Sequence, residues 1–298
     1  MRRDPDDVLG LRPDGDGWSR GGRPWEAPGP FYAVIGDPVA HSLSPVIQGA
    51  ALRDAGLPYA YHAARITSGD LPRVFRDRGR LALRGFNVTA PHKLAAASLC
   101  GELTEAARLT SAVNTARLGP GGWEGHNTDV GGLGDVLEER LDGRAAGPGL
   151  VLGAGGAARA AVAALLAAGA NPVSVMARPG PGRDGLSVWL STVSLAGRPV
   201  RLVDWGTVPD ALTTSAGAVC VSCLPGGVDL TFLDRAVGDR QPTLWLDMNY
   251  GARAAAPTGV SAGRICDGRS VLVAQGARSF AWWFDRDAPR RVMADALS

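Results

Sequence analysis

Lysine is almost absent from this sequence. Lys93 is its only lysine, and all the other basic residues among the 31 Lys and Arg are arginines. Arginine stays protonated at any working pH, whereas a lysine ammonium can release its proton. Lys93 is therefore a candidate for proton transfer to or from a reacting oxygen. The alternative is that a single lysine remains by chance in a composition biased toward arginine.

Cysteine is also scarce, and the four cysteines (Cys100, Cys220, Cys223 and Cys266) are too few for a disulfide framework in a chain of 298 residues. Cys220 and Cys223 form a lone Cys-x-x-Cys in an apolar, strand-like stretch that has no second pair of ligands nearby. We therefore expect small core residues there, rather than a metal or redox site.

The chain lacks a strong excess of either charge, and its net charge of +2 argues against a broad basic surface for nucleic acid. No apolar run is long enough to span a membrane, and the first residues lack the apolar core of a secretory signal. We expect a cytoplasmic protein that binds a small molecule and neither nucleic acid nor membrane. Whether it is a monomer or a homodimer stays open.

The length of 298 residues suggests two domains, and a hydrophobic content of 45% is enough to fill their cores. Residues 1–30 are rich in Gly, Pro, Arg and Asp without periodicity, which predicts a flexible leader. Beyond them, short apolar runs alternate with helical stretches, which predicts an α/β protein with a parallel, doubly wound sheet. The predicted strands are 31–36, 59–63, 85–88, 149–152, 172–176, 199–204, 217–223 and 243–248, and the predicted helices include 45–55 and 71–78.

Two polar loops follow predicted strands in the first half of the chain. In Gly85-Phe86-Asn87-Val88-Thr89-Ala90-Pro91-His92-Lys93, side chains that can bind a polar ligand precede a proline that could open a helix and fix Lys93 in its first turn. Ser42 and Ser44 are two positions apart, so in an extended loop their hydroxyls would face the same side. Together they could bind a carboxylate or a diol. The structural alternative is that Ser44 is a helix N-cap followed by proline.

Asp129 lies in a Gly-flanked, turn-like segment before another helical stretch, where a capping aspartate is an equally good interpretation. Further on, Gly149 to Arg159 reads as strand, tight turn and helix, and Gly153, Gly155 and Ala158 fit G-x-G-x-x-G/A. This context predicts a dinucleotide site in which backbone amides and a helix N-terminus meet the pyrophosphate.

The strand after the glycine loop ends in Ala177-Arg178-Pro179, where an NAD-binding protein would carry an acidic residue for the ribose 2′-hydroxyl. A cation there suits the 2′-phosphate of NADP. Arg178 therefore predicts NADP as the cofactor, and an ordinary surface arginine is the alternative.

Together these motifs resemble the shikimate dehydrogenase family. The matching segments keep the family's order over about residues 31–285 and are more specific together than singly. They are His41-Ser42-Leu43-Ser44-Pro45, Asn87-Val88-Thr89-Ala90-Pro91-His92-Lys93, Ala112-Val113-Asn114-Thr115, Asn127-Thr128-Asp129, Gly153-Ala154-Gly155-Gly156-Ala157 and Gln275-Gly276.

The resemblance implies a substrate domain at 31–133 completed by C-terminal helices at 267–298, an NADP-binding Rossmann domain at 134–266, and a cleft between them. It implies reversible reduction of 3-dehydroshikimate to shikimate in the aromatic amino-acid pathway, with Lys93 and Asp129 as the catalytic pair. Ser42 and Ser44 would bind the substrate carboxylate. Other substrate contacts map to Asn87, Thr89, Asn114, Tyr250 and Gln275, and cofactor contacts to Gly153, Ala154, Gly155, Gly156, Ala157 and Arg178.

Three departures from the family pattern affect substrate identity more than fold. Gln48-Gly49 replaces a usual His-Asn, Ala177 replaces an Asn, and Gly251-Ala252-Arg253 lacks the usual Pro and Thr. A quinate or aminoshikimate dehydrogenase is therefore the main alternative, although two serines in the substrate loop favour shikimate. An inactive, dinucleotide-binding regulatory protein is a further alternative, and intact Lys93 and Asp129 argue against it.

Overall fold

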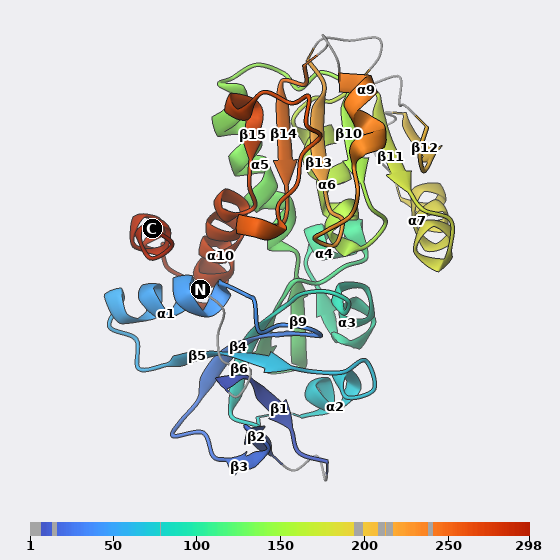
Figure 1. Cartoon of the computed structure of the whole chain (residues 1–298). Coiled ribbons are helices and arrows are strands. Elements are labelled where there is room, and N and C mark those ends of the chain that lie inside the picture. Colours follow the sequence, from blue (N-terminus) through green and yellow to red (C-terminus); the bar gives the residue numbers. More distant parts are fainter. Residues whose placement is uncertain are drawn as a thin grey trace. The chain divides into compact units, whose positions relative to one another are not determined.

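The computed structural model describes residues 7–13, 17–77, 79–193, 199–207, 212, 217–237 and 241–298 (Figure 1). The chain divides into two compact units, Met1–Thr128 with Gln275–Ser298, and Asp129–Ala274. The sequence predicts these divisions at 133/134 and 266/267. In the structure the divisions fall at 128/129 and 274/275, inside the continuous helices α5 (Thr128–Leu141) and α10 (Arg269–Phe284), where a periodic pattern marks no boundary. None of the described helices is long and apolar enough to cross a membrane.

The first unit is built on a sheet with the strand order β3-β2-β1-β5-β4-β6-β8-β9-β7. Its strands are β1 (Leu9–Leu11), β2 (Trp18–Arg20), β3 (Arg23–Trp25), β4 (Phe31–Gly36), β5 (Ala60–Arg65), β6 (Leu83–Val88), β7 (Glu102–Leu103), β8 (Thr115–Gly119) and β9 (Gly122–His126). All six residues of β4 are buried, as its apolar run predicts, and β4 runs parallel to both β5 and β6. The helices are α1 (Ser44–Asp54), α2 (Leu71–Arg76), α3 (Lys93–Leu99), α4 (Glu105–Thr110), α11 (Arg290–Asp295) and the C-terminal part of α10.

The prediction of a flexible leader over residues 1–30 is wrong where the structure describes that segment. Strand β1 pairs with β2 and, in parallel, with β5, so the segment extends the sheet (Figure 1). Leu9 and Trp18 are buried in the core, and the Trp18 indole donates a hydrogen bond to the Leu81 carbonyl at 2.9 Å. Each strand has only three residues, too few to show periodicity amid Gly and Pro. Residues 1–6 and 14–16 lie outside the described part.

Helix α10 lies directly against strands β6 and β8 of the first unit. The Trp283 indole donates a hydrogen bond to the Ala116 carbonyl at 3.0 Å. Gly85 leaves room for this contact, because a Cβ there would lie 2.8 Å from Trp283 Nε1 and 2.9 Å from the Ala116 oxygen. Close packing therefore explains the glycine at position 85, two residues before Asn87.

We expect Gly85→Ala to lower the free energy of unfolding by about 1–3 kcal/mol, because the added methyl group overpacks this contact. Urea denaturation followed by tryptophan fluorescence measures the change. Gly134→Ala is the matched control, since Gly134 lies inside helix α5 and a Cβ there meets nothing within 4 Å. That variant should be unchanged or more stable. Equal stability of Gly85→Ala and the wild type would contradict the packing argument.

The second unit contains the predicted parallel sheet, with strand order β12-β11-β10-β13-β14-β15 (Figure 1). This is the order of a Rossmann fold, in which ligands bind at the carboxyl ends of the strands where the order reverses. The strands are β10 (Gly149–Leu152), β11 (Val173–Ala177), β12 (Val200–Asp204), β13 (Val219–Ser222), β14 (Leu244–Asp247) and β15 (Ile265–Cys266). The main helices are α5, α6 (Gly156–Ala167) and α7 (Pro181–Thr192), with a short α9 (Asp234–Val237).

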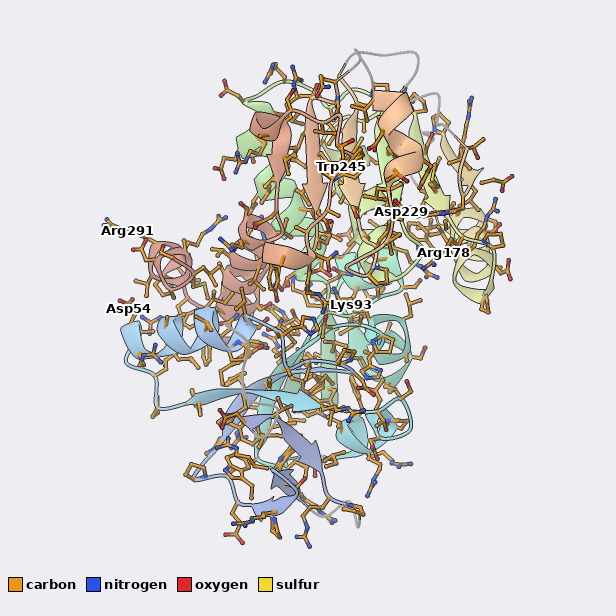
Figure 2. All side chains as sticks on the ribbon, viewed as in Figure 1. Asp54, Lys93, Arg178, Asp229, Trp245 and Arg291 are labelled. Carbon is orange, nitrogen blue, oxygen red and sulfur yellow. The ribbon has the colours of Figure 1, made fainter. Side chains whose placement is uncertain are left out.

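The central strands of this sheet are buried on both faces. Leu150 and Leu152 belong to one apolar cluster with Trp245, whereas Val151 belongs to the other (Trp245 is labelled in Figure 2). Cys220 lies in β13 with a free thiol, whose pKa burial raises to about 12. The described residues contain no group of His, Cys, Asp and Glu that could hold a metal ion.

Candidate functional site

The predicted substrate loops of the first unit meet at one edge of its sheet. Strands β4 and β6 run parallel, so the loops that follow them leave from the same edge. Two backbone hydrogen bonds join these loops, from the Thr89 amide to the Ile35 carbonyl (2.9 Å) and from the Asp37 amide to the Ala90 carbonyl (3.1 Å). Gly36 allows this approach, because a Cβ there would overlap the Thr89 methyl group. The topology thus brings together two motifs that are far apart in sequence.

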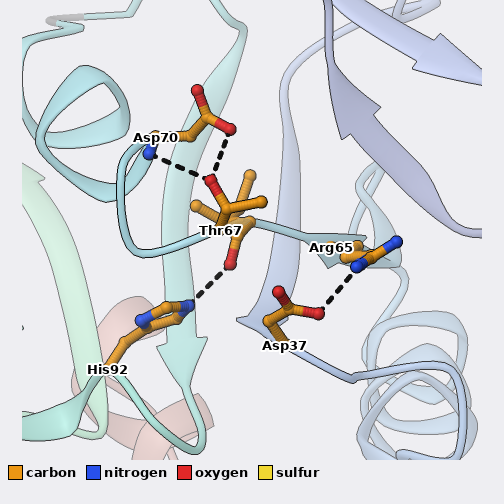
Figure 3. Close-up of polar contacts among 6 residues, drawn as sticks. Asp37, Arg65, Thr67, Asp70 and His92 are labelled. Carbon is orange, nitrogen blue, oxygen red and sulfur yellow. Dashed lines mark hydrogen bonds and ion pairs between the residues drawn. The ribbon is translucent and has the colours of Figure 1, made fainter.

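Lys93 is the first residue of helix α3, two residues after Pro91, as the sequence predicts (Lys93 is labelled in Figure 2). Its carbonyl accepts a hydrogen bond from the Val113 amide at 2.9 Å. The preceding His92 is buried, and its imidazole donates a hydrogen bond to the Ile66 carbonyl at 2.6 Å (Figure 3). The start of the helix is therefore fixed on both sides of Lys93.

Charged side chains hold the neighbouring loops in the same region. Asp37, which follows β4, pairs with Arg65 at 2.8 Å, and the Thr67 hydroxyl donates to Asp70 at 2.7 Å (Figure 3). The Thr67 hydrogen bond is also the main reason why the pKa of Asp70 is lowered. These exposed contacts hold the loop after β5, whose Ile66 carbonyl accepts the hydrogen bond from His92.

Ser42 and Ser44 are both buried. Helix α1 begins at Ser44, and its N-cap is Leu43, which makes no side-chain capping bond. The interpretation of Ser44 as the N-cap is therefore wrong, because Ser44 is already helical. The Ser42 oxygen instead accepts a hydrogen bond from the Ser44 amide at 3.3 Å. That bond occupies one acceptor position of the Ser42 hydroxyl and leaves its hydrogen able to donate.

A buried network of amides and hydroxyls lies beside these loops. Asn114 is its centre: its Oδ1 accepts from the Thr128 amide (2.7 Å) and the Thr115 hydroxyl (3.0 Å), and its Nδ2 donates to Thr128 Oγ1 (2.9 Å) and Gln275 Oε1 (3.3 Å). The side chain of Asn114 is 2% exposed. The predicted contacts Asn114, which directly precedes strand β8, and Gln275, in helix α10, are thus brought together.

Asn87 joins the same network from strand β6. Its Oδ1 accepts from the Tyr61 hydroxyl at 2.7 Å, and its Nδ2 lies 3.0 Å from Thr115 Oγ1 and 2.9 Å from Ser279 Oγ. Sequence reasoning missed Tyr61, Thr115 and Ser279. Ser279 could have been found, because it lies one helical turn after Gln275, and its hydroxyl donates to the Gln275 carbonyl at 3.0 Å. These bonds hold the Asn87 side chain in the network, and its contact with substrate stays a prediction.

Asp129 is the second residue of helix α5 and is only 3% exposed. Its interpretation as an N-cap is wrong, because the helix already includes Thr128. A buried carboxylate in the first turn is favoured by the helix dipole. The hydrogen bond from the Thr128 amide to Asn114 fixes the residue that precedes Asp129.

His126, just before this motif, gives the first unit a predicted pH dependence. Its Nδ1 lies 2.7 Å from Thr104 Oγ1, and burial, followed by the charges of Arg278 and Arg117, lowers its pKa from 6.5 to about 4. Between these values the unfolded chain binds a proton that the folded chain does not. The contribution of His126 to the free energy of unfolding should therefore be fully present above pH 6.5 and should be lost as the pH decreases toward 4.

We expect the titration of His126 to lower the free energy of unfolding by about 1–3 kcal/mol between neutral pH and about pH 4. Urea denaturation at several pH values measures it. His126→Gln should show a smaller loss over the same range, and the difference between the two proteins isolates His126 from the carboxylates. Identical slopes for both would contradict the prediction.

The predicted dinucleotide loop joins β10 to α6 in the second unit. Gly153 has φ +120°, which L side chains rarely adopt, and a Cβ there would lie 3.2 Å from the Cys223 carbonyl oxygen. Gly155 is exposed, and a Cβ on it would meet nothing within 4 Å, so a ligand can approach its backbone. Helix α6 begins at Gly156 and runs for 12 residues. Its free N-terminal amides and dipole suit a pyrophosphate.

Arg178 directly follows strand β11 and is exposed (Figure 2). Its guanidinium carbon lies 5.7 Å from the centre of the Trp205 ring, which follows β12. Arg183 is already paired with Asp204 at 2.6 Å. Arg178 thus stands at the carboxyl edge of the sheet, where the ribose of a dinucleotide lies in a Rossmann fold.

Tyr250, half-buried, follows strand β14 at the same edge. The buried Asp247 carboxylate holds its loop by accepting hydrogen bonds from the amides of Asn249 (2.8 Å) and Ala255 (2.7 Å). Burial raises the pKa of Asp247, whereas these hydrogen bonds oppose the shift. The structure orders the Asp-x-x-Tyr segment, and the contact of Tyr250 with substrate stays a prediction.

Comparison of the chain with known proteins identifies its family. The family model described as the shikimate dehydrogenase substrate binding domain matches residues 34–116, and that of the shikimate 5′-dehydrogenase C-terminal domain matches 268–297. A shikimate dehydrogenase (NADP(+)) from Anaeromyxobacter sp. is 38% identical over 277 residues, which covers 90% of this chain and 95% of the relative. One from Microcystis aeruginosa is 33% identical and covers 90% and 96%.

Solved structures of shikimate dehydrogenases have a similar fold. Shikimate dehydrogenase of Mycobacterium tuberculosis superposes with a TM-score of 0.74 at 29% identity and covers 90% of this chain and 98% of that one. Shikimate 5-dehydrogenase of Thermus thermophilus in complex with shikimate gives 0.72 at 29% identity, with 90% and 97% coverage. The identity to curated relatives over nearly their whole length shows that the chain belongs to the shikimate dehydrogenase family.

Proposed function

We propose that this protein is an NADP-dependent shikimate dehydrogenase, which interconverts 3-dehydroshikimate and shikimate. The proposal is supported by the meeting of the loops that follow β4 and β6, on which Ser42, Ser44, Thr89 and Lys93 lie, in a chain 38% identical to a shikimate dehydrogenase (NADP(+)). A carboxylate, a ring hydroxyl and a carbonyl are the groups of this substrate that such side chains can bind.

The residues of the second unit fit NADP. The amides of Gly155, Gly156 and Ala157 would hold its pyrophosphate, Gly153 and Ala154 would shape the turn, and Arg178 would bind its 2′-phosphate. When bound, NADPH supplies the hydride and NADP accepts it. The open space around Gly155 and the exposure of Arg178 support this fit.

The protein's own contribution would be to bind, orient and move a proton. Ser42 and Ser44 would donate hydrogen bonds to the substrate carboxylate and fix the ring. During reduction the carbonyl oxygen gains negative charge, and Lys93 would give it a proton; during oxidation Lys93 would take that proton back. Asp129 would orient the Lys93 ammonium, and its carboxylate would accept a hydrogen bond from the hydroxyl that the reduction forms. Asn87, Asn114 and Gln275 would make other polar contacts with the substrate.

A spectrophotometric assay of the purified protein tests the proposal. NADP or NAD is offered with shikimate or with quinate, and formation of the reduced nicotinamide is followed. We expect fast oxidation of shikimate with NADP and little with NAD. Binding of NADP without turnover of any cyclitol acid would contradict the proposal and favour a regulatory protein.

Quinate or aminoshikimate as substrate is the second candidate, and Gln48 favours it. This residue is buried beside the substrate loop where the family often has histidine. Turnover of quinate alone would move the protein to that sister activity and leave the proposed roles of Lys93 and Asp129 intact.

A further inference from the structure

Within the first unit, helix α1 closely approaches the C-terminal part of helix α10 at Gly276. Gln48 Nε2 donates a hydrogen bond to the Gly276 carbonyl at 2.8 Å, and the two residues are 228 positions apart in sequence. A Cβ on Gly276 would lie 2.7 Å from Ile47 Cδ1 and 3.3 Å from Gln48 Nε2. The glycine therefore lets the amide of Gln48 reach the backbone of α10.

The Gln48 amide has a defined orientation. A flipped amide would place two oxygen acceptors 2.8 Å apart, so the nitrogen faces the Gly276 carbonyl. Gln48 is 1% exposed, and its Oε1 has no hydrogen-bond partner among the described residues. Burying an unmatched amide oxygen is unfavourable, so stability alone does not explain a glutamine here. Gly276 lies inside α10, where its carbonyl also accepts a bond from the helix itself.

The hydrogen bond connects two elements of the predicted substrate site. Ser44 and Gln48 are four residues apart in α1, which places them on one face of that helix. Gly276 directly follows Gln275, whose Oε1 lies 3.3 Å from Asn114 Nδ2 and 3.4 Å from Thr128 Oγ1. The amide of Gln48 thus joins the helix that carries Ser44 to the helix that carries Gln275.

We propose that Gln48 is a positioning residue that sets the spacing between Ser44 and Gln275, and thereby the affinity for the cyclitol acid. The proposal rests on the proposed function of the site, because these two residues would contact the carboxylate and a hydroxyl at different places on one ring. If the spacing changes, the substrate cannot satisfy both contacts at once. The residue acts through Ser44 and Gln275 and touches no reacting atom.

Gln48→Met tests the hydrogen bond, because methionine keeps the length of the side chain and lacks the donor. We expect the KM for shikimate to rise about 3–10-fold, the loss of one hydrogen bond, with kcat and the KM for NADP unchanged. Gln241→Met is the matched control, since Gln241 Nε2 makes the same kind of bond, 2.6 Å from the Gly259 carbonyl oxygen, in the second unit. Its KM for shikimate should equal that of the wild type.

Gln48→Glu separates positioning from simple packing. A protonated carboxyl group can donate to the Gly276 carbonyl, whereas a carboxylate only repels it, and burial raises the pKa of a carboxyl group. We expect the ratio of the variant's KM for shikimate to that of the wild type to be near 1 at about pH 6 and to exceed about 10 at about pH 9. A merely structural role gives a ratio that does not change with pH.

The two proposals fail in different ways. Wild-type turnover of shikimate together with an unchanged KM in a folded Gln48→Met variant overturns the positioning role alone, as does a ratio for Gln48→Glu that is independent of pH. If the wild type oxidises quinate instead, the same ratios are measured with quinate. No turnover of either acid overturns both proposals.

Discussion

Lys93→Arg is expected to lower kcat for shikimate oxidation by about 10²–10⁴-fold, the range in which a positioned acid or base contributes. Arginine keeps the positive charge at the start of helix α3 but does not release a proton at working pH. The exchange therefore separates charge from proton transfer. Lys93 is the first residue of α3, held by His92 and Val113, so the new side chain starts from a fixed backbone position.

Steady-state rates with saturating shikimate and NADP measure this loss, and circular dichroism checks the fold. Binding of NADP should stay normal, because the predicted cofactor residues belong to the second unit. Arg108→Gln, in helix α4, is a control for a charge change in the first unit and should keep its activity. Near-normal kcat for Lys93→Arg would remove Lys93 from proton transfer and leave it at most a binding role.

Much of the fold follows from local pattern. The apolar run 31–36 predicts the buried strand β4, and the strand, glycine turn and helix around Gly153 predict the start of the Rossmann sheet. These features were predictable because one short segment contains the whole signal. By contrast, strands β1 to β3 depend on single buried residues such as Leu9 and Trp18, whose burial arises only when β1 pairs with β5.

The candidate site shows the same division. The sequence singles out Lys93 by its type, since no other lysine exists in the chain, and by the polar loop around it, and its catalytic role stays a prediction. The bonds among Asn87, Thr115 and Ser279 were not predictable, because they join residues up to 192 positions apart. Gln48 could be predicted only in part. The sequence shows that it departs from the family pattern, and only the fold shows that its side chain reaches Gly276.

Arg178→Gln is expected to raise the KM for NADP by about 10–100-fold and to leave the KM for NAD nearly unchanged. Hydrogen bonds to a charged group contribute about 1.5–3 kcal/mol, which corresponds to this range. The exposed guanidinium stands at the end of β11 beside the Trp205 ring, and Arg183 is engaged with Asp204. The loss should therefore be specific to the cofactor that carries a 2′-phosphate.

Arg201→Gln makes the same chemical change in the neighbouring strand β12, where Arg201 is exposed and pairs in register with Ser174, before the carboxyl edge is reached. It should leave both KM values as in the wild type. Initial rates at varied NADP and NAD, with shikimate saturating, give the ratio of the two preferences. A parallel rise in both KM values for Arg178→Gln would indicate a damaged loop, whereas no change in either would place the 2′-phosphate away from β11. The ratio thus distinguishes recognition of a phosphate from a general role in folding the nucleotide site.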